Sequence, residues 1–324
     1  MARSKVKSMA EAISLIQDGD VILTGGWTVV RRPMAAAREI IRQRKKDLHL
    51  VCGTPGTDSD MLIGAGCVAL GEQSYIGHEK FGTPNNFMRA VEAGSEASGF
   101  RYDDCSLQMS WLRVQAAAMG VPFLPSLTCK GSDILNPDYD TMKELRGKHP
   151  KLPKKKYATM KDPFWDGGEV ILVPSIKADV AIVHVDEASP DGNCFIGRAV
   201  FGDRLVAMAA KKTIITTEKI VPIEKLREKA ESTAIPAMYV TAVVEAPYGA
   251  HPTQMPGLYD YDDLSYQKYV EASRSVAAFG QWLKEWVTDL ENHEQYVSKL
   301  GQECLTNIRA DPKYGYNPNL RRRD

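Results

Sequence analysis

The residues best suited to chemistry form a short turn near the N-terminus. An apolar, strand-like run leads into Gly25 and Gly26, and Pro33 suits the first position of a helix. Glycine permits φ > 0 and lets a ligand approach the bare backbone. Arg31 and Arg32 place positive charge beside the same turn. The pattern predicts free amide N–H groups that, with the helix dipole, hold a carboxylate, a phosphate or an oxyanion.

A second candidate is the loop Tyr75–Gly82, which follows an apolar run and contains the adjacent residues His78 and Glu79. Loops at strand ends are where α/β proteins tend to place their chemistry. Glu79 is therefore a candidate for acid–base work. A solvated loop carboxylate paired with Lys80 explains the same residues without any function.

Two histidines outside these loops favour structural roles. His184 lies on an apolar strand, where a lone histidine is more often a hydrogen-bonded core residue than a ligand. His251, in the segment Gly249–Pro252, fits either contact with a substrate or partner or a packed turn. Metal-ligand spacing such as HExxH, a GxGxxG fingerprint and a Walker A loop are all missing from the sequence. We therefore predict no metal, no nicotinamide and no nucleoside triphosphate.

Composition narrows the class of protein. The chain has 324 residues, with 41 Lys plus Arg against 41 Asp plus Glu. This balance argues against a dedicated nucleic-acid binder. The six cysteines form no CxxC pair, so we expect reduced thiols. The N-terminus is polar, and no apolar run approaches the roughly 20 residues that span a bilayer. We expect a cytoplasmic protein without nucleic-acid or membrane partners.

Short apolar runs alternate with helical patterns, which predicts an α/β fold with an open, largely parallel sheet. The expected strands are Val21–Thr24, Leu48–Cys52, Val170–Val173, Ala181–Val185, Thr213–Thr217 and Tyr239–Val244. The expected helices are Pro33–Lys46, Gln108–Met119 and much of Gln267–Leu300. Strands of a parallel sheet are buried on both faces, so we expect the last four runs to be buried in this way.

We expect one domain over residues 1–309. Within it, residues 131–167 contain four prolines and few apolar residues, which predicts a surface excursion. Residues 310–324 form a C-terminal tail that we expect to be frayed or packed on a partner.

Segments spread over most of the chain resemble the alpha-type subunits of family I coenzyme A transferases. The turn has the family's Gly-Gly-aromatic sequence and downstream proline, with Trp27 where phenylalanine is usual and Arg31 where many members have glycine. The other similar segments are Asp60–Gly66, Ala116–Pro125, Ala188–Gly192, Ala246–Pro252, Gly257–Asp262 and Lys284–Leu290. The Arg-Arg-Pro sequence is nearer to the glutaconate CoA-transferase branch of the family.

The resemblance implies an open sheet of the CoA-transferase type with C-terminal helices. It also implies a reaction in which a glutamate attacks an acyl-CoA and becomes an enzyme–CoA thioester, before a second carboxylate takes the CoA. The family carries that glutamate in a Ser-Glu-Asn-Gly-like motif of the beta-type subunit, and this chain has no such motif. We therefore expect half of an active site, with a beta-type partner, a coenzyme A thioester as substrate and no permanently bound cofactor.

Particular residues take roles from this resemblance. Gly25, Gly26, Trp27 and Thr28 would form the acyl and oxyanion wall, while Arg31 or Arg32 would pair with a carboxylate of a glutaconate-like dicarboxylic substrate. The loop with His78 and Glu79 would border the substrate pocket, where Glu79 would orient water or set substrate choice. The basic run Lys154–Lys156 could contact the phosphates of coenzyme A, although a solvated charge cluster is the favoured interpretation.

Two other functions remain open. Ring-cleaving CoA-thioester hydrolases of steroid degradation have alpha-type subunits that share the Gly-Trp turn. They are expected to use an acid in the segment before the small-residue helix, which here reads Asp103–Met109 and contains no glutamate. The third possibility is a sugar-phosphate sensor, but the residues before Asp18 are too few for a helix-turn-helix.

Overall fold

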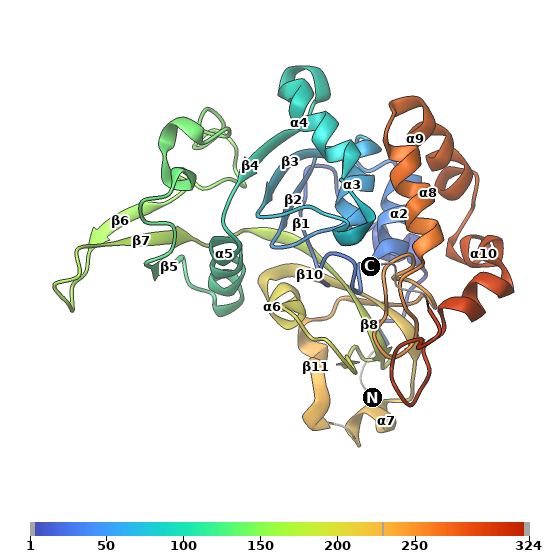
Figure 1. Ribbon diagram of the computed structural model, residues 1–324. Coiled ribbons are helices and arrows are strands. Elements are labelled where there is room, and N and C mark those ends of the chain that lie inside the picture. The colour runs from blue at the N-terminus through green and yellow to red at the C-terminus, as the bar shows by residue number, and fades with distance from the viewer. Residues whose placement is uncertain (1–3, 229, 321–324) are drawn as a thin grey trace.

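Parallel strands with apolar side chains on both faces form the centre of the molecule (Figure 1). The computed structural model describes residues 4–228 and 230–320. In spatial order, the parallel strands are β12 (Ala242–Glu245), β10 (Ala210–Ile220), β8 (Ala178–Ala188), β1 (Val21–Thr24), β2 (Leu48–Cys52), β3 (Val68–Gln73) and β4 (Arg101–Asp104). Two short antiparallel strands, β9 (Cys194–Phe195) and β11 (Thr233–Ile235), extend from the end of β8. The predicted α/β fold with an open, largely parallel sheet is confirmed.

Successive residues of each central strand join different hydrophobic clusters. In β1, Ile22 belongs to one cluster, whereas Val21 and Leu23 belong to the other. In β8, Ile182 and Val183 are divided in the same way. Because both faces are covered, the strands read as continuous apolar runs rather than as an alternating pattern.

Helices cover the two faces of the sheet. They are α1 (Met9–Ile13), α2 (Met34–Arg42), α3 (Thr57–Gly64), α4 (Asn85–Ser98), α5 (Leu107–Met119), α6 (Asp203–Ala209), α7 (Ile223–Arg227), α8 (Asp263–Ser273), α9 (Val276–Leu283) and α10 (His293–Ile308). The helices α1, α2, α3, α8 and α9 contribute to one cluster, and α5 and α6 to the other. Within the described ranges, the structure has no helix that combines the length and the apolar character needed to cross a bilayer.

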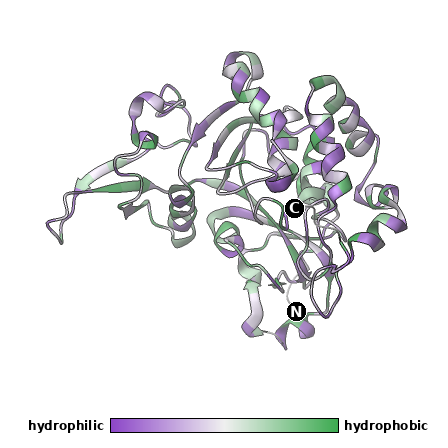
Figure 2. Cartoon of the chain, viewed as in Figure 1, coloured by the Kyte–Doolittle hydropathy of each residue, from purple (hydrophilic) through white to green (hydrophobic). Residues whose placement is uncertain are grey.

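A separate three-stranded sheet forms an arm that projects from the body, at left in Figure 1. Its strands are β5 (Phe123–Ser126), β6 (Ala158–Lys161) and β7 (Glu169–Pro174), and β7 pairs antiparallel with both neighbours. Our expectation of a strand buried on both faces at Val170–Val173 was therefore wrong. Figure 2 shows β7 as largely hydrophobic, but only alternate residues, Ile171 and Val173, are buried, as is typical of an antiparallel strand with one solvated face. The arm includes the 131–167 excursion and the strands that flank it.

Buried charges attach the arm to the main sheet. Glu72 on β3 accepts two hydrogen bonds from Arg113 of α5, both of 3.0 Å. Arg146 and Lys156, from the arm, bind Asp103 on β4 at 2.9 Å and 3.0 Å. Because each charge is compensated inside the protein, the arm has a fixed position at this edge of the sheet.

The C-terminal segment packs back on its own chain as far as it is described. Main-chain hydrogen bonds join Ala310 to Leu258 at 2.9 Å and Gly257 to Gly315 at 3.0 Å. The prediction of a frayed tail is therefore wrong for residues 310–320, because these bonds hold them against the 255–260 segment, while packing on a partner stays a prediction. Residues 321–324 lie outside the described ranges.

The buried Glu72 makes the stability of the chain sensitive to acid. Burial alone would raise the pKa of this carboxyl, but Arg113 and His49 hold its pKa well below the usual range. A carboxyl whose pKa is lower in the folded state stabilises the protein above its unfolded pKa, near 4.3, and this contribution is lost as the pH falls.

We expect Glu72→Gln to lower the free energy of unfolding by about 3–5 kcal/mol at pH 7, because Arg113 keeps an unpaired buried charge. The difference in the free energy of unfolding between the variant and the unmodified chain should be smaller by about 1 kcal/mol at pH 3.5 than at pH 7. Urea unfolding at the two pH values measures this, with the exposed Glu303→Gln as the control. An equal loss at both pH values would contradict the charged state of Glu72.

Candidate active site

The candidate site is built from loops at the carboxyl ends of β1, β2 and β3, which lie side by side. The amide of Thr28, after β1, donates to the carbonyl of Thr54, after β2, at 2.9 Å. The amide of Gly77, after β3, donates to the carbonyl of Pro55 at 3.4 Å. Parallel strands share one edge for their carboxyl ends, so both loops that the sequence singled out come together.

The turn after β1 is unusually sharp. Gly26, Thr28 and Arg31 have φ values of +79°, +39° and +51°. Trp27 and Val30 exchange main-chain hydrogen bonds of 2.8 Å and 2.6 Å, which close the turn. A Cβ on Gly26 would lie 2.4 Å from the carbonyl oxygen of Arg31, so only glycine fits there. Such left-handed residues persist only where the surroundings hold them, and they cluster at functional sites.

The carboxylate of Asp203, from the start of α6, holds this turn. Its Oδ1 accepts a hydrogen bond from the amide of Gly26 at 2.8 Å, and its Oδ2 pairs with Arg31 at 2.7 Å. The same Oδ2 accepts from the amide of Phe201 at 3.1 Å. Burial would raise the pKa of Asp203, but Arg31 and these amides lower it overall. The anion that the glycine turn was predicted to hold is thus a carboxylate of the chain itself.

The amides of the turn are largely occupied, in contrast to the free N–H groups that we predicted. Gly25 donates to Ile182, Trp27 to Val30 and Arg31 to Gln254. An amide in the first turn of α2 is occupied as well, because Ala35 donates to the carbonyl of Gly249 at 2.9 Å. The sequence-based expectation failed here because main-chain acceptors from distant segments reach these donors first.

Both arginines of the turn are buried and paired. Arg31 and Arg32 are each 0% exposed. Arg32 contacts Asp58, at the start of α3, through Nε at 2.8 Å and Nη2 at 2.6 Å. Arg31 donates to the carbonyl of Ala199 at 2.7 Å in addition to its ion pair with Asp203. These guanidinium groups compensate internal charge, so the structure does not place them as free partners for a substrate carboxylate.

Trp27 keeps an accessible edge. Its ring stacks on that of the exposed Phe201, with centroids 5.5 Å apart and planes inclined by 27°. The guanidinium of Arg31 lies 5.7 Å from the centre of the Phe201 ring. The partly exposed aromatic pair, rather than bare backbone, is therefore what the turn presents at the surface.

The second loop buries His78 and displays Glu79. The His78 ring packs edge-on against Tyr269, with centroids 5.6 Å apart, and its Nδ1 lies 3.2 Å from the hydroxyl of Thr57. Glu79 follows in the left-handed region, with φ of +52°, and is exposed. The alternative partner Lys80 instead binds Asp263 at 3.2 Å. Among the described residues, no hydrogen bond or ion pair of the Glu79 carboxylate is found, so this group is available to solvent or a ligand.

His184 is a packed residue, as the sequence indicated. Its two nitrogens lie 2.9 Å from Thr216 and 2.7 Å from Glu218, and the ring is 0% exposed.

His251 is likewise 0% exposed and lies in a packed turn, not at a free surface. It contacts the hydroxyl of Tyr296 at 2.7 Å and Asp262 at 3.0 Å. Its ring nitrogen, Asp262 and Cys304 lie within 4.8 Å of one another, although Cys304 already donates to Asp262 at 3.1 Å. Burial lowers the pKa of His251, despite the opposing effect of Asp262.

Sequence reasoning missed Asp203 and Asp58, the carboxylates that organise the site. We did not predict from the sequence that both arginines are buried, although the general preference of buried arginines for nearby anions was available. The choice of partner was not, because Asp203 lies 172 positions from Arg31.

With this geometry in place, comparison with known proteins identifies the family. A model of the coenzyme A transferase family matches residues 6–246, so the chain belongs to that family. The A-type subunit of glutaconate CoA-transferase from Acidaminococcus fermentans is 39% identical over 322 residues, which cover 99% of both chains. The crystal structure of that glutaconate coenzyme A-transferase aligns with a TM-score of 0.93 over 98% of this chain and 99% of that chain.

More distant relatives have two kinds of named activity. The A-type subunit of the 3-oxoadipate CoA-transferase of Pseudomonas knackmussii is 30% identical over 92% of this chain and 99% of that protein. The cholesterol ring-cleaving hydrolase IpdA subunit of Rhodococcus jostii is 26% identical over 93% of this chain and 98% of that protein. The family resemblance stated from the sequence motifs is confirmed, and this hydrolase subunit is less similar to the chain than the two transferase subunits named above.

The pairing of Arg31 with Asp203 can be measured by a double-mutant cycle. We expect Arg31→Met and Asp203→Asn each to lower the free energy of unfolding by about 3–5 kcal/mol, because each leaves one buried charge unpaired. The loss in the double variant should be smaller by about 1–3 kcal/mol than the sum of the two single losses. Urea unfolding gives the three values. The exposed pair Glu271 and Arg274 serves as the control and should couple by less than about 1 kcal/mol. Strict additivity at the buried pair would show that the turn does not depend on it.

Proposed function

We propose that this chain is the alpha-type, or A-type, subunit of a cytoplasmic heteromeric CoA-transferase. The enzyme moves CoA between an acyl-CoA and a free carboxylic acid. The match that carries this proposal is the A-type subunit of glutaconate CoA-transferase, which is similar over nearly the whole length in both sequence and structure. The five cysteines whose side chains are described are free, in keeping with a reducing compartment.

A dicarboxylic acid is the substrate class that we propose. Glutaconate and 3-oxoadipate, named in two of the relatives, are both dicarboxylic acids. The partly exposed rings of Trp27 and Phe201 would pack against the apolar part of the acyl group. Glu79, exposed and unpaired on the neighbouring loop, would orient a water molecule or restrict which acid enters.

The division of labour follows from where the carboxylates lie. In the turn and loops described above, Asp203 and Asp58 are held in buried ion pairs and cannot reach a substrate. A nucleophilic carboxylate must be accessible and aligned with the thioester carbonyl. Glu79 is exposed, but this chain lacks the Ser-Glu-Asn-Gly-like motif that carries the nucleophile in the family that it resembles. We therefore assign the nucleophile to a glutamate of a beta-type subunit, and to this chain the wall that holds the acyl group across the interface.

In the proposed reaction, the partner's carboxylate attacks the thioester carbonyl and CoA leaves as a thiolate, which gives a mixed anhydride. The thiolate then attacks the glutamyl carbonyl and releases the first acid, leaving an enzyme–CoA thioester. The second acid reverses both steps and departs as its CoA thioester. This sequence is balanced without a metal, an oxidant or a reductant.

Hydrolytic ring cleavage of a CoA thioester is the second candidate, because the Rhodococcus jostii hydrolase subunit is similar over 93% of this chain. That function needs an available acid in the segment before α5. Asp103, in this segment, is buried and bound to both Arg146 and Lys156. Asp104 in the same segment is exposed, so the feature that favours transfer over hydrolysis is the absence of a glutamate from Asp103–Met109.

Trapping the intermediate tests the proposed division of labour. The chain is co-expressed with a beta-type subunit, incubated with an acyl-CoA, and reduced with borohydride, which converts an enzyme–CoA thioester to an alcohol. We expect mass spectrometry to locate the modification on a glutamate of the partner, both with the unmodified chain and with Glu79→Gln. A modification at Glu79, or full turnover by this chain alone, would overturn the proposal.

Substitution of the arginines tests whether they select dicarboxylic substrates. Because both guanidinium groups are committed internally, we expect Arg31→Lys and Arg32→Lys to lower kcat/KM by the same factor for dicarboxylic and monocarboxylic acceptors. Steady-state kinetics with a matched pair of acids measures this. A loss confined to the dicarboxylic acid would restore the direct clamp that the sequence suggested for these residues.

A further inference from the structure

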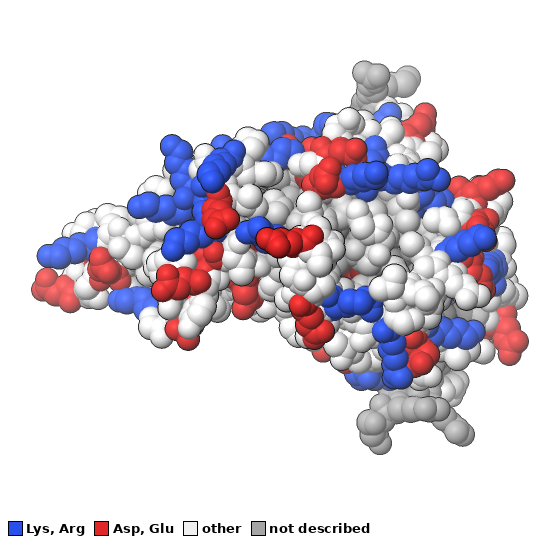
Figure 3. Space-filling view, turned by 90° about the horizontal axis from the view of Figure 1, so that it is seen from above, with Lys and Arg blue, Asp and Glu red and all other residues white. Residues whose placement is uncertain are grey.

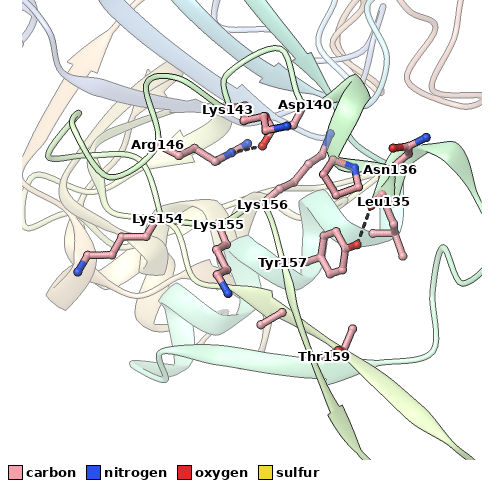
Figure 4. Close-up of a pocket in the computed structure, with 12 residues that line it drawn as sticks. Leu135, Asn136, Asp140, Lys143, Arg146, Lys154, Lys155, Lys156, Tyr157 and Thr159 are labelled. Carbon is pink, nitrogen blue, oxygen red and sulfur yellow. Dashed lines mark hydrogen bonds and ion pairs between the residues drawn. The ribbon is translucent and has the colours of Figure 1, made fainter.

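The arm contains a cavity of about 520 Å³ whose lining is strongly basic (Figure 4). Its charged side chains are Lys143, Arg146, Lys154, Lys155, Lys156 and a single carboxylate, that of Asp140. Figure 3 shows the same excess of positive charge as a group of blue side chains over the arm, at left. The formal charge of the whole chain is zero, so this concentration is local.

Two of these cations are already neutralised. Arg146 binds Asp140 at 2.7 Å and Asp103 at 2.9 Å, and Lys156 binds Asp103 at 3.0 Å. Arg146 nonetheless belongs to the lining of the cavity as a buried residue, because its side chain is 3% exposed. Its Nη1 has no hydrogen-bond partner among the described residues. A buried donor without a partner is costly and indicates a missing acceptor nearby.

The remaining charge is free. Lys154 and Lys155 are exposed, and within residues 4–228 and 230–320 neither forms an ion pair or side-chain hydrogen bond. Figure 4 shows their side chains extending from the loop that leads into Tyr157, away from the Arg146–Asp140 pair. Lys143 contacts Asp138 at 3.8 Å, and both side chains are largely exposed, so this pair compensates little of its charge. An anion with more than one negative group matches this arrangement.

Apolar surface lies directly beside the lysines. The Tyr157 hydroxyl donates to the carbonyl of Leu135 at 2.7 Å, which fixes the ring in the cavity wall. An adjoining hollow of about 390 Å³ shares Lys154, Lys155 and Tyr157 and is bordered by Phe123, whose side chain is 43% exposed. A flat aromatic base can pack on such a ring while its phosphates reach the lysines. Inorganic phosphate alone would leave this apolar surface unused.

We propose that the cavity and the adjoining hollow, lined by Lys154, Lys155, Tyr157 and Phe123, bind the 3′-phosphoadenosine diphosphate portion of a CoA thioester. This proposal rests on the proposed function for the identity of the ligand. It assigns the binding of the CoA nucleotide to the arm, whereas the glycine turn would contact the acyl group. The phosphates contact the lysines and the adenine packs against the aromatic and proline side chains.

The position of the arm agrees with this assignment. Arg146 and Lys156 bind Asp103, next to the carboxyl end of β4, and the glycine turn follows the carboxyl end of β1. These ends lie at the same edge of the parallel sheet, three strand spacings or roughly 14 Å apart. The extended pantetheine arm of CoA, which separates its nucleotide from its thioester, can bridge such a gap.

Calorimetric titration of the complex with its beta-type partner tests the site. The probes are CoA, dephospho-CoA, which lacks the 3′-phosphate, and inorganic pyrophosphate. We expect the double variant Lys154→Glu/Lys155→Glu to weaken CoA by about tenfold or more and to weaken dephospho-CoA less, because fewer phosphates meet the reversed charge. Phe123→Ala should weaken CoA but leave pyrophosphate unchanged.

The matched control is Lys161→Glu, the same charge reversal at an exposed lysine of β6 outside the lining. It should change CoA affinity by less than about twofold. Gel filtration of every variant checks that the two chains still assemble.

Each other outcome overturns the assignment. If all variants bind CoA with equal affinity, the cavity is not a CoA site. If pyrophosphate binds as tightly as CoA, the cavity is only a general anion site. If a lysine variant no longer assembles with the partner, the lysines contact a protein. Failure of the proposed function is distinguishable, because CoA can bind here in a complex that transfers nothing. Conversely, active transfer with an unchanged KM for acyl-CoA in the double lysine variant refutes only the site.

Discussion

The buried ion pairs of Arg31 with Asp203 and of Arg32 with Asp58 are the constraint on which the rest of the candidate site depends. Each of these two buried guanidinium groups requires a compensating partner, which here is a carboxylate close by. That requirement places the starts of α6 and α3 against the turn and holds its left-handed residues in place. It also fills the anion position at Gly26 with a side chain of the chain itself.

This filling changes what the turn can do. A glycine turn before a helix can form a binding site for an external anion. In this chain, the amides of the turn donate to internal acceptors instead. The turn is therefore a rigid scaffold that presents the rings of Trp27 and Phe201. Chemistry that needs an accessible carboxylate then has to come from the exposed loop residue Glu79 or, as we propose, from a second polypeptide.

The same rule of charge compensation organises the arm. Asp103 draws Arg146 and Lys156 to the edge of the sheet, and these contacts leave Lys154 and Lys155 uncommitted at the surface. In the main body, several buried arginines are paired with carboxylates and serve packing, whereas Arg38, with no ion pair among the described residues, lies over the ring of Tyr296. In the arm, charge exceeds what packing requires, and the excess lies beside exposed aromatic surface. We thus expect a ligand to bind where exposed positive charge lacks a carboxylate partner, not at the buried Arg31 and Arg32.

The sequence by itself determined the α/β class, the limits of β1 and β2, the family and the packed role of His184. These depend on local apolar runs, on turn residues and on motifs that can be read within a few positions. Only the tertiary structure decided the antiparallel pairing of β7, the partners of Arg31 and Arg32, and the exposure of Glu79. Each of these depends on which distant segments meet in space, and the free energy of burying a charge or an amide is settled by those neighbours.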